Sequence, residues 1–303
     1  ERGFKKVRAA RTAKTSSNKE KAFRVLALKN EYSLKHLLNA VELPRSVFYY
    51  QKKSLGKPVP YQEERKLISD IYHEHKGRYG YRRVHLELRK TYKMNKKTVQ
   101  RLMLELGLKS TVRPKKYSSY KGEQGQVAPN VLKRDFNADK PDEKWVTDVT
   151  EFKVKGQKVY LSPVIDTFNQ EVVAYRVEKH VRLTLVTGML EDSLAKLDSR
   201  SKPIVHSDQG WQYRHSKYKK MLKDAGLTQS MSRKGNCLDN AVAENFFALL
   251  KTEMYHGRQF ESANELISAI KEYITYYNQK RIKVKLKGLT PVEYRNQALK
   301  EAA

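Results

Sequence analysis

The sequence contains a single cysteine, Cys237, and this scarcity removes two classes of structure. One cysteine forms neither an intramolecular disulfide nor a zinc site built from several thiolates, and a reducing compartment suits such a chain. No apolar run approaches the ~18 residues of a membrane-spanning helix, and no signal peptide with an apolar core stands at the start. These absences predict a soluble cytoplasmic protein without a membrane partner.

Acidic residues are also scarce relative to basic ones. The 303 residues include 33 Asp and Glu against 62 Lys and Arg, which gives a formal net charge of +29. Residues 1–140 carry 35 basic and 13 acidic side chains, whereas residues 141–303 carry 27 and 20. Such an excess repels itself unless a polyanion neutralises it, so nucleic acid is the first candidate partner. The asymmetry predicts a DNA-binding front half joined to a more balanced back half; a ribosome-associated protein and a basic membrane-surface protein are the alternatives.

The N-terminal part of the sequence is typical of a basic arm followed by a small helical unit. Residues 1–20 contain almost no large apolar residues, so they cannot bury enough surface to fold alone. Over residues 21–56, apolar residues recur at helical spacing in two segments joined by the turn VELP. This pattern predicts a helix-turn-helix in which Arg45 is available to DNA, although two helices that only pack together fit it equally well.

A second helical DNA-binding module is expected over residues 61–110. Its last helix should end near Gly107, with Leu106 on the core side. Near the start of that helix, where a recognition helix meets bases or phosphates, stand Lys96, Lys97, Gln100 and Arg101. The segment GRYGYRR interleaves aromatic residues with Arg82 and Arg83, which suits phosphate contact and stacking as well as a core filled by tyrosines.

After a basic linker over residues 111–138, the pattern changes to strands. Three β-branched runs, KWVTDVTEF, KVYLSPVIDTF and EVVAYRVEKH, predict an antiparallel meander. A helix, a strand, a helix, a strand and a long helix follow, and residues 261–303 form a C-terminal helical extension. This order predicts an α/β ribonuclease-H-like catalytic core over residues 139–260, with a central mixed five-stranded sheet and flanking helices, preceded by all-α helix-turn-helix modules.

Three carboxylates occupy positions that this fold would bring together. Asp148 is expected in the middle of the first strand, Asp208 just beyond the fourth, and Glu244 on the helix after GNCLDNA. The first and fourth strands are neighbours at the centre of such a sheet, so the three acids can meet. Clustered carboxylates bind Mg²⁺, and two ions about 3.5–4 Å apart promote phosphodiester chemistry. Taken singly, each acid is more typical of a turn or a salt bridge.

The motifs around these acids resemble those of the DDE integrase and transposase superfamily. WVTD, HSDQG and NAVAENFF occur in that order, with 35 residues between Asp208 and Glu244. The match covers about residues 139–300. Together with GRYGYRRV and LKGLTPVEYRNQ, these blocks are similar to transposases of bacterial insertion sequences, whose core resembles retroviral integrase.

The resemblance implies an enzyme that cleaves DNA at the ends of an insertion sequence and joins the freed 3′-hydroxyl to another phosphodiester. Asp148, Asp208 and Glu244 would be the catalytic residues and the ligands of two Mg²⁺ ions, for which Mn²⁺ would substitute. The implied partners are the terminal inverted repeats, target DNA and at least one further copy of the chain, at the bacterial nucleoid. Lys251 stands where the family has a residue that contacts the end of the element; by physics alone it is an ordinary surface lysine.

Residues beside the triad also have both a functional and a structural interpretation. Arg233 and Lys234 form a basic loop that could bind DNA, but loops of so basic a protein are commonly basic. Asn240, one turn before Glu244, could orient a carboxylate. Tyr213 could stack on an unpaired base or fill the core, and His206 is interpreted as a structural histidine.

Two other functions are compatible with the same fold. A metal-dependent nuclease would use water as the nucleophile and never a 3′-hydroxyl. A DNA-binding regulator would carry a decayed catalytic core. The intact triad argues against the regulator, and the paired helical modules argue against a general nuclease, which needs less sequence recognition.

Overall fold

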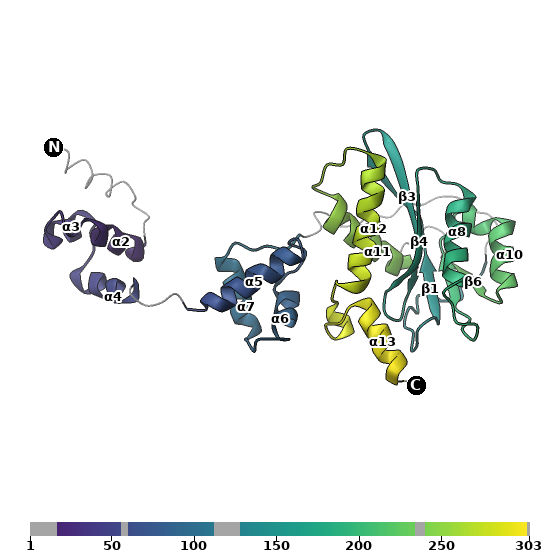
Figure 1. Ribbon diagram of the computed structural model, residues 1–303, viewed down its shortest axis with the longest axis horizontal. Coiled ribbons are helices and arrows are strands. Elements are labelled where there is room, and N and C mark those ends of the chain that lie inside the picture. Colours follow the sequence, from purple (N-terminus) through teal and green to yellow (C-terminus); the bar gives the residue numbers. More distant parts are fainter. Residues whose placement is uncertain (1–16, 56–59, 112–127, 234–239, 302–303) are drawn as a thin grey trace. The chain divides into compact units, whose positions relative to one another are not determined.

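The computed structural model describes residues 17–55, 60–111, 128–233 and 240–301 (Figure 1). The chain divides into two compact units, residues 1–66 and 67–303. Among the helices within the described ranges, none is both long and apolar enough to cross a membrane.

The first unit contains three helices around a small apolar core: α2 (Asn18–Leu28), α3 (Leu34–Ala40) and α4 (Arg45–Leu55). Buried residues from all three helices form this core, among them Val25, Leu38 and Phe48. The helices expected on either side of VELP are therefore confirmed. The Ser17 side chain accepts a hydrogen bond from the Glu20 backbone, and Glu20 caps Ser17 in return. This capping box starts α2 inside the segment expected as an arm.

Three further helices form the predicted second helical module: α5 (Gln62–Glu74), α6 (Tyr81–Leu88) and α7 (Lys96–Glu105). The Asn95 side chain caps α7 by accepting a hydrogen bond from the Lys97 backbone at 2.9 Å. Buried apolar residues join the three helices: Ile68, Tyr79, Val84, Leu88, Val99, Leu102 and Met103. Leu106, expected in this core, is 36% exposed because α7 ends at Glu105 and Leu106 is already its C-cap.

The catalytic half is built on one mixed sheet with strands β1 (Lys144–Thr147), β2 (Thr150–Val154), β3 (Gln157–Asp166), β4 (Val172–Glu178), β5 (Ile204–Ser207) and β6 (Thr228–Met231). β3 pairs antiparallel with β4 along one edge and with both β1 and β2 along the other. β5 runs parallel to β1, and β6 parallel to β5. Since β1 and β2 are consecutive pieces of one interrupted strand, the sheet has five positions across. This is the ribonuclease-H-like order predicted from the sequence.

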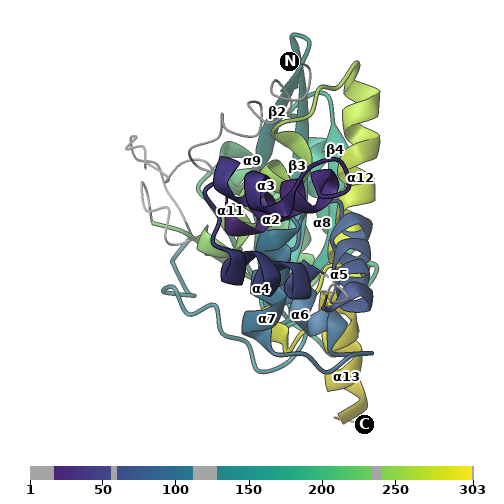
Figure 2. The same ribbon diagram turned by 90° about the vertical axis from the view of Figure 1, so that its left-hand side faces the viewer.

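Helices cover both faces of the sheet (Figure 1). On one face, α8 (Leu183–Leu194), the short α9 (Trp211–Arg214) and α10 (Ser216–Asp224) pack on an apolar cluster around Trp145, Val164 and Val205. On the other lie α11 (Ala241–Leu250), its continuation the π-helical turn η2 (Lys251–Tyr255), and α12 (Ala263–Gln279). In the view of Figure 2, α12 runs beside β3 and β4, both of which it contacts.

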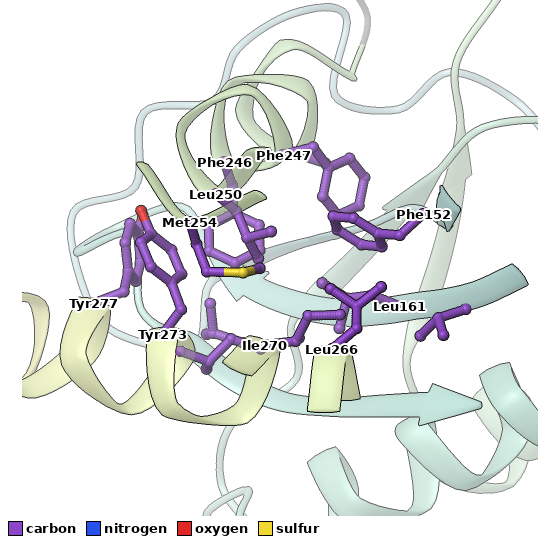
Figure 3. Packing of buried hydrophobic residues seen from close by; sticks show 14 of the residues in the cluster. Phe152, Leu161, Phe246, Phe247, Leu250, Met254, Leu266, Ile270, Tyr273 and Tyr277 are labelled. Atoms are coloured by element: carbon purple, nitrogen blue, oxygen red, sulfur yellow. The ribbon is translucent and has the colours of Figure 1, made fainter. Parts of the chain in front are cut away.

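The α11 and α12 face has the larger apolar core. Figure 3 shows Phe152 of β2 and Leu161 of β3 packed with side chains of the two helices. The labelled helix residues include Phe246, Phe247 and Leu250 of α11 and Leu266 and Ile270 of α12. The short 3₁₀ turn η3 (Val284–Leu286) and α13 (Pro291–Glu301) follow α12. Thr290 and Glu293 form a capping box at the start of α13, and Arg295 of α13 binds Asp142 and Asp166.

Candidate active site

Two of the three acids stand at the same end of the sheet. Asp148 follows β1 directly, and Asp208 follows β5 directly. Because β1 and β5 are parallel neighbours, their carboxyl ends meet at one edge, where sites in α/β sheets commonly form. The expectation that Asp148 lies mid-strand is corrected: its carboxylate accepts the backbone N–H of Val149 at 2.7 Å, and this local bond accompanies the break between β1 and β2.

Glu244 joins them from the first turn of α11. The residue before that helix, Asn240, donates a hydrogen bond from Nδ2 to the backbone oxygen of Thr147 at 3.3 Å. Thr147 is the last residue of β1, so this bond fixes the start of α11 beside Asp148. Asn240 thus positions the helix that carries Glu244, while its expected role of orienting a carboxylate stays a prediction.

The electrostatics show that the acids share one region. Burial raises the pKa of Asp148 to about 8, and the negative charges of Asp208 and Glu244 contribute, while the Val149 N–H and Lys251 act in the opposite direction. Burial also raises the pKa of Asp208 against the Gly210 N–H and the positive charge of Arg214. Since like charges raise each other's pKa only at short range, the site concentrates negative charge that local cations do not balance.

The donor set fits a hard divalent cation. All three side chains offer carboxylate oxygens, the ligands that Mg²⁺ prefers. The Asn240 Oδ1 atom is buried and has no hydrogen-bond partner, which leaves one more hard oxygen beside β1. Within the described ranges, no three His, Cys, Asp or Glu side chains already stand as ligands of one ion. The fit therefore concerns the chemistry of these oxygens and not a preformed ligand geometry.

Gly210 is a site residue that the sequence did not single out. Its backbone N–H donates to Asp208 Oδ1 at 2.9 Å and so fixes that carboxylate. A Cβ atom at this position would lie 2.6 Å from Gln212 Nε2 and 2.9 Å from Asp208 Oδ1, closer than real contacts allow. A larger residue would require the ends of the Asp208 and Gln212 side chains to shift, and the HSDQG motif was the available signal.

The residues beneath the carboxylates are structural. Tyr213 is fully buried, and its hydroxyl lies 3.3 Å from Thr147 Oγ1, so it fills the core and does not stack on a base. His206 is also buried, with Nδ1 2.8 Å from Ser230 Oγ, as a structural histidine should be. Trp211, by contrast, is 48% exposed.

Lys251 begins η2, two helical turns beyond Glu244. It is half-buried, with Nζ 5.3 Å from the centroid of the Phe152 ring. Burial lowers the pKa of Lys251, and the charges of Glu151 and Asp148 partly offset this. Lys251 is thus a cation in the electric field of the acids, unlike a freely solvated surface lysine.

The other side chains expected at DNA lie on different elements. Most are exposed: Arg45 on α4, Arg82 on α6, Lys96, Lys97, Gln100 and Arg101 on α7, and Arg233 after β6. Arg83 is half-buried and lies against the catalytic half, with Nη1 4.0 Å from Glu253 Oε1. Lys234 lies outside the described residues. DNA contact by each of these stays a prediction.

Comparison with known families agrees with this division of the chain. Residues 138–237 match the family described as Integrase core domain, and residues 244–299 match a second family of the same description. Residues 60–116 match a family described as HTH-like domain. Both parts of the expected architecture are therefore shown.

Individual relatives cover most of the chain. The InsK protein of insertion sequence element IS150 from Escherichia coli is 56% identical over 271 residues, which are 89% of this chain and 96% of that protein. A transposase-like protein of Haemophilus influenzae is 52% identical and covers 70% of this chain and 98% of its own length. A solved structure of the HTLV-2 integrase catalytic core with magnesium has a TM-score of 0.40 and 19% identity, covering 52% of this chain and 97% of that one. The chain belongs to the insertion-sequence transposases, DNA-transposing enzymes with an integrase catalytic core.

Proposed function

We propose that Asp148, Asp208 and Glu244 are the catalytic residues of this transposase and that they hold two divalent ions, Mg²⁺ or in its place Mn²⁺. One observation carries the proposal: burial and the charges of Asp208 and Glu244 raise the pKa of Asp148 to about 8. Carboxylates whose pKa is raised by loss of water and by neighbouring acids are costly to folding and are typical of functional sites.

Each side chain has a distinct part in the reaction. Burial and the neighbouring acids raise the pKa of Asp148, and this carboxylate would hold a divalent ion in its deprotonated form. The Gly210 N–H holds Asp208 at the end of β5, and α11 brings Glu244 to the same edge. Bound divalent ions supply an activated oxygen nucleophile and stabilise the charge on the leaving oxygen. Lys251 binds a DNA phosphate near the reacting bond.

In strand transfer, one P–O bond forms and one breaks, so the reaction needs no further reactant. The 3′-hydroxyl at the element end loses its proton and forms a new P–O bond to the target phosphorus. The P–O bond to the target's own 3′ oxygen breaks, and that oxygen takes up a proton. The preceding cleavage is the same displacement with water as the nucleophile.

DNA is the proposed partner of the helical modules, in particular the terminal inverted repeats of the element. The relatives carry the names of insertion sequence elements, and α7 presents Lys96, Lys97, Gln100 and Arg101 on its exposed side. Phosphate contacts of this kind predict binding that weakens steeply with salt, and Lys96→Ala should lower the log–log salt slope by about 1. A flat salt dependence would contradict phosphate-dominated contact. Since two element ends must be paired, we further propose at least a dimer acting at the bacterial nucleoid.

The decisive experiment uses the full chain, Mg²⁺ and a labelled terminal repeat. The wild-type protein should join the labelled strand to a second DNA, and Asp148→Asn should abolish joining while the affinity for the repeat is retained. Cleavage without a joined product would favour a nuclease that only hydrolyses. Undiminished joining by Asp148→Asn would remove the site assignment.

A further inference from the structure

The GRYGYRR segment between α5 and α6 lies against the catalytic half. Tyr79 is fully buried, stacks on His75 with ring centroids 3.7 Å apart, and donates its hydroxyl to the backbone oxygen of Lys280 at 3.0 Å. The same hydroxyl accepts the backbone N–H of Ile282 at 2.9 Å. This tyrosine therefore connects the helical module to the segment that follows α12.

Arg78 makes a second connection. Only 5% of Arg78 is exposed, and its guanidinium lies 4.4 Å from the Tyr276 ring centroid and 5.2 Å from that of Tyr273. Its Nε donates to the backbone oxygen of Glu253 at 3.3 Å. An arginine so enclosed by aromatic rings and a carbonyl is not available to a DNA phosphate.

Glu253 is the centre of this contact. Arg281 donates to its carboxylate from Nη2 at 2.6 Å and from Nε at 2.9 Å, and the Tyr273 hydroxyl donates at 3.0 Å. The side chains of Glu253 and Arg281 are 5% and 1% exposed. Burial alone would raise the pKa of Glu253, but the hydrogen bonds and charge of Arg281, together with Arg83, lower it. Glu253 is thus a fully compensated buried carboxylate.

The position of Glu253 connects this contact to the active site. It belongs to η2, which continues α11, so Glu244 lies nine residues earlier and Lys251 two. The π-turn closes with the His256 N–H donating to the Lys251 oxygen at 2.6 Å. A hydrogen bond also connects η2 to β2: the Tyr255 hydroxyl donates to the backbone oxygen of Lys153 at 2.6 Å. π-helical turns inside α-helices occur frequently at functional sites.

We propose that Glu253 is a positioning residue for catalysis, through which the helical module α5–α7 fixes the placement of Glu244 and Lys251. The proposal rests on the proposed function of the triad. We call the contact the module–core joint, formed by Arg78, Tyr79, Arg83, Glu253, Tyr273, Tyr276 and Arg281. Apart from this joint, the described residues hold α11 and η2 by apolar packing and by the hydrogen bonds of Asn240 and Tyr255. The joint adds a network of several directed bonds around Glu253. DNA held by α7 is thereby kept in register with the metal site.

Two variants of the full chain test the joint from its two sides. Glu253→Gln keeps the shape and removes the charge that Arg281 and Arg83 face. Tyr79→Phe removes only the hydroxyl that bonds Lys280 and Ile282. Glu272→Gln is the matched control, because the Lys76–Glu272 ion pair joins the same two parts but its side chains are 50% and 68% exposed. Joining is measured at saturating repeat DNA, with affinity for the repeat measured separately.

We expect Glu253→Gln to lower the joining rate about tenfold or more, since small displacements of catalytic groups have effects of that size. The Mg²⁺ concentration for half-maximal rate should rise because Glu244 is displaced, while the affinity for repeat DNA is retained. Tyr79→Phe should lower the rate in the same way, and the double variant should lose less than the product of the two losses. The control should match the wild type in every measurement.

Hydrogen exchange gives a readout that needs no activity. Backbone amides of residues 241–255 should exchange faster in Glu253→Gln and Tyr79→Phe, and not in Glu272→Gln. If the wild type joins no DNA, the proposed function fails, yet this measurement still decides the joint. Unchanged exchange over 241–255 together with an unchanged Mg²⁺ requirement in Glu253→Gln would overturn the proposal, even if that variant were less stable. A double variant whose loss of joining rate equals the product of the two single losses would also overturn the proposal.

Discussion

Two carboxylate sites with opposite surroundings are connected by α11 and its continuation η2, which carry Glu244 and Glu253. At the active site, Asp148 faces Asp208 and Glu244, and its pKa is raised to about 8. At the module–core joint, Glu253 faces Arg281 and Arg83, and its pKa is lowered. The three acids of the active site are half-buried, and the Glu253 side chain is 5% exposed, so neither set is fully solvated. The direction of the pKa shift distinguishes the two sites. Acids without a compensating cation have a raised pKa and are suited to bind a metal ion, whereas Glu253, which Arg281 compensates, has a lowered pKa and stabilises the fold.

Removing the compensating cation should have the largest effect on stability. Arg281→Met removes the main cationic partner of the buried Glu253 carboxylate and leaves the Tyr273 hydroxyl and the more distant Arg83. We expect a loss of about 3–5 kcal/mol in the free energy of unfolding. Urea denaturation without metal measures it. Adding Glu253→Met to Arg281→Met should recover most of the loss because no buried charge remains. A loss below about 1 kcal/mol in the single variant would show that Glu253 is not the charge that Arg281 compensates.

The pH dependence of stability should distinguish the two groups. The folded chain keeps the Asp148 proton up to about pH 8, while the unfolded chain releases it near the ordinary pKa of 3.8. Stability from this group is fully present below about pH 3.8 and is lost as pH rises to about 8, with a slope of at most about 1.4 kcal/mol per pH unit. The pKa of Glu253 is lowered from its ordinary value of 4.5. Stability from this group is therefore present above about pH 4.5 and is lost only as pH falls through the lowered pKa.

Thermal melting between pH 5 and 8, with and without Mg²⁺, measures this dependence. Mg²⁺ should reverse the decline, since it binds the deprotonated acids. A metal-free stability that is level or rises over this range would contradict the assigned direction for Asp148.

Neutralising one acid of the active site should stabilise the metal-free chain. Asp148→Asn removes a charge that Asp208 and Glu244 oppose, so we expect a gain of about 1 kcal/mol or more at pH 8 and a flatter pH profile. The same variant should lose stabilisation by Mg²⁺. Destabilisation comparable to that of Arg281→Met would place Asp148 with the structural carboxylates instead.

The smallest effect is expected at the surface of the joint. Glu272→Gln breaks an exposed ion pair with Lys76, and such pairs contribute about 0–1 kcal/mol because water and salt screen them. We expect a change of at most about 0.5 kcal/mol, measured by the same urea titration. A larger loss would mean that charge pairing across the joint matters irrespective of burial.

The arrangement of the sheet was predictable from the sequence, because strand-length apolar runs and their order restrict the topology. The parallel pairing of β1 with β5 confirms the expected neighbours. The break at Asp148 was not predictable from periodicity. It accompanies a hydrogen bond from Val149 to the Asp148 carboxylate, and WVTDVT contains no glycine or proline to mark it.

The GRYGYRR segment shows the limit of local pattern. Interleaved arginine and tyrosine suit phosphate contact and a buried joint equally well. The structure buries Arg78 and Tyr79, and the partner of Arg78, Glu253, lies 175 residues further along the chain. No local signal connects two segments so distant, so only the tertiary structure assigns the role.

The position of the Asp208 carboxylate depends on Gly210 as well as on the acids of the site. A methyl group at this position would collide with the Asp208 carboxylate and the Gln212 amide without changing any charge. A diverged copy of this chain could therefore keep Asp148, Asp208 and Glu244 and yet hold the Asp208 carboxylate in a different position. When copies of such a chain are compared, the glycine after HSDQ belongs with the acids in the comparison.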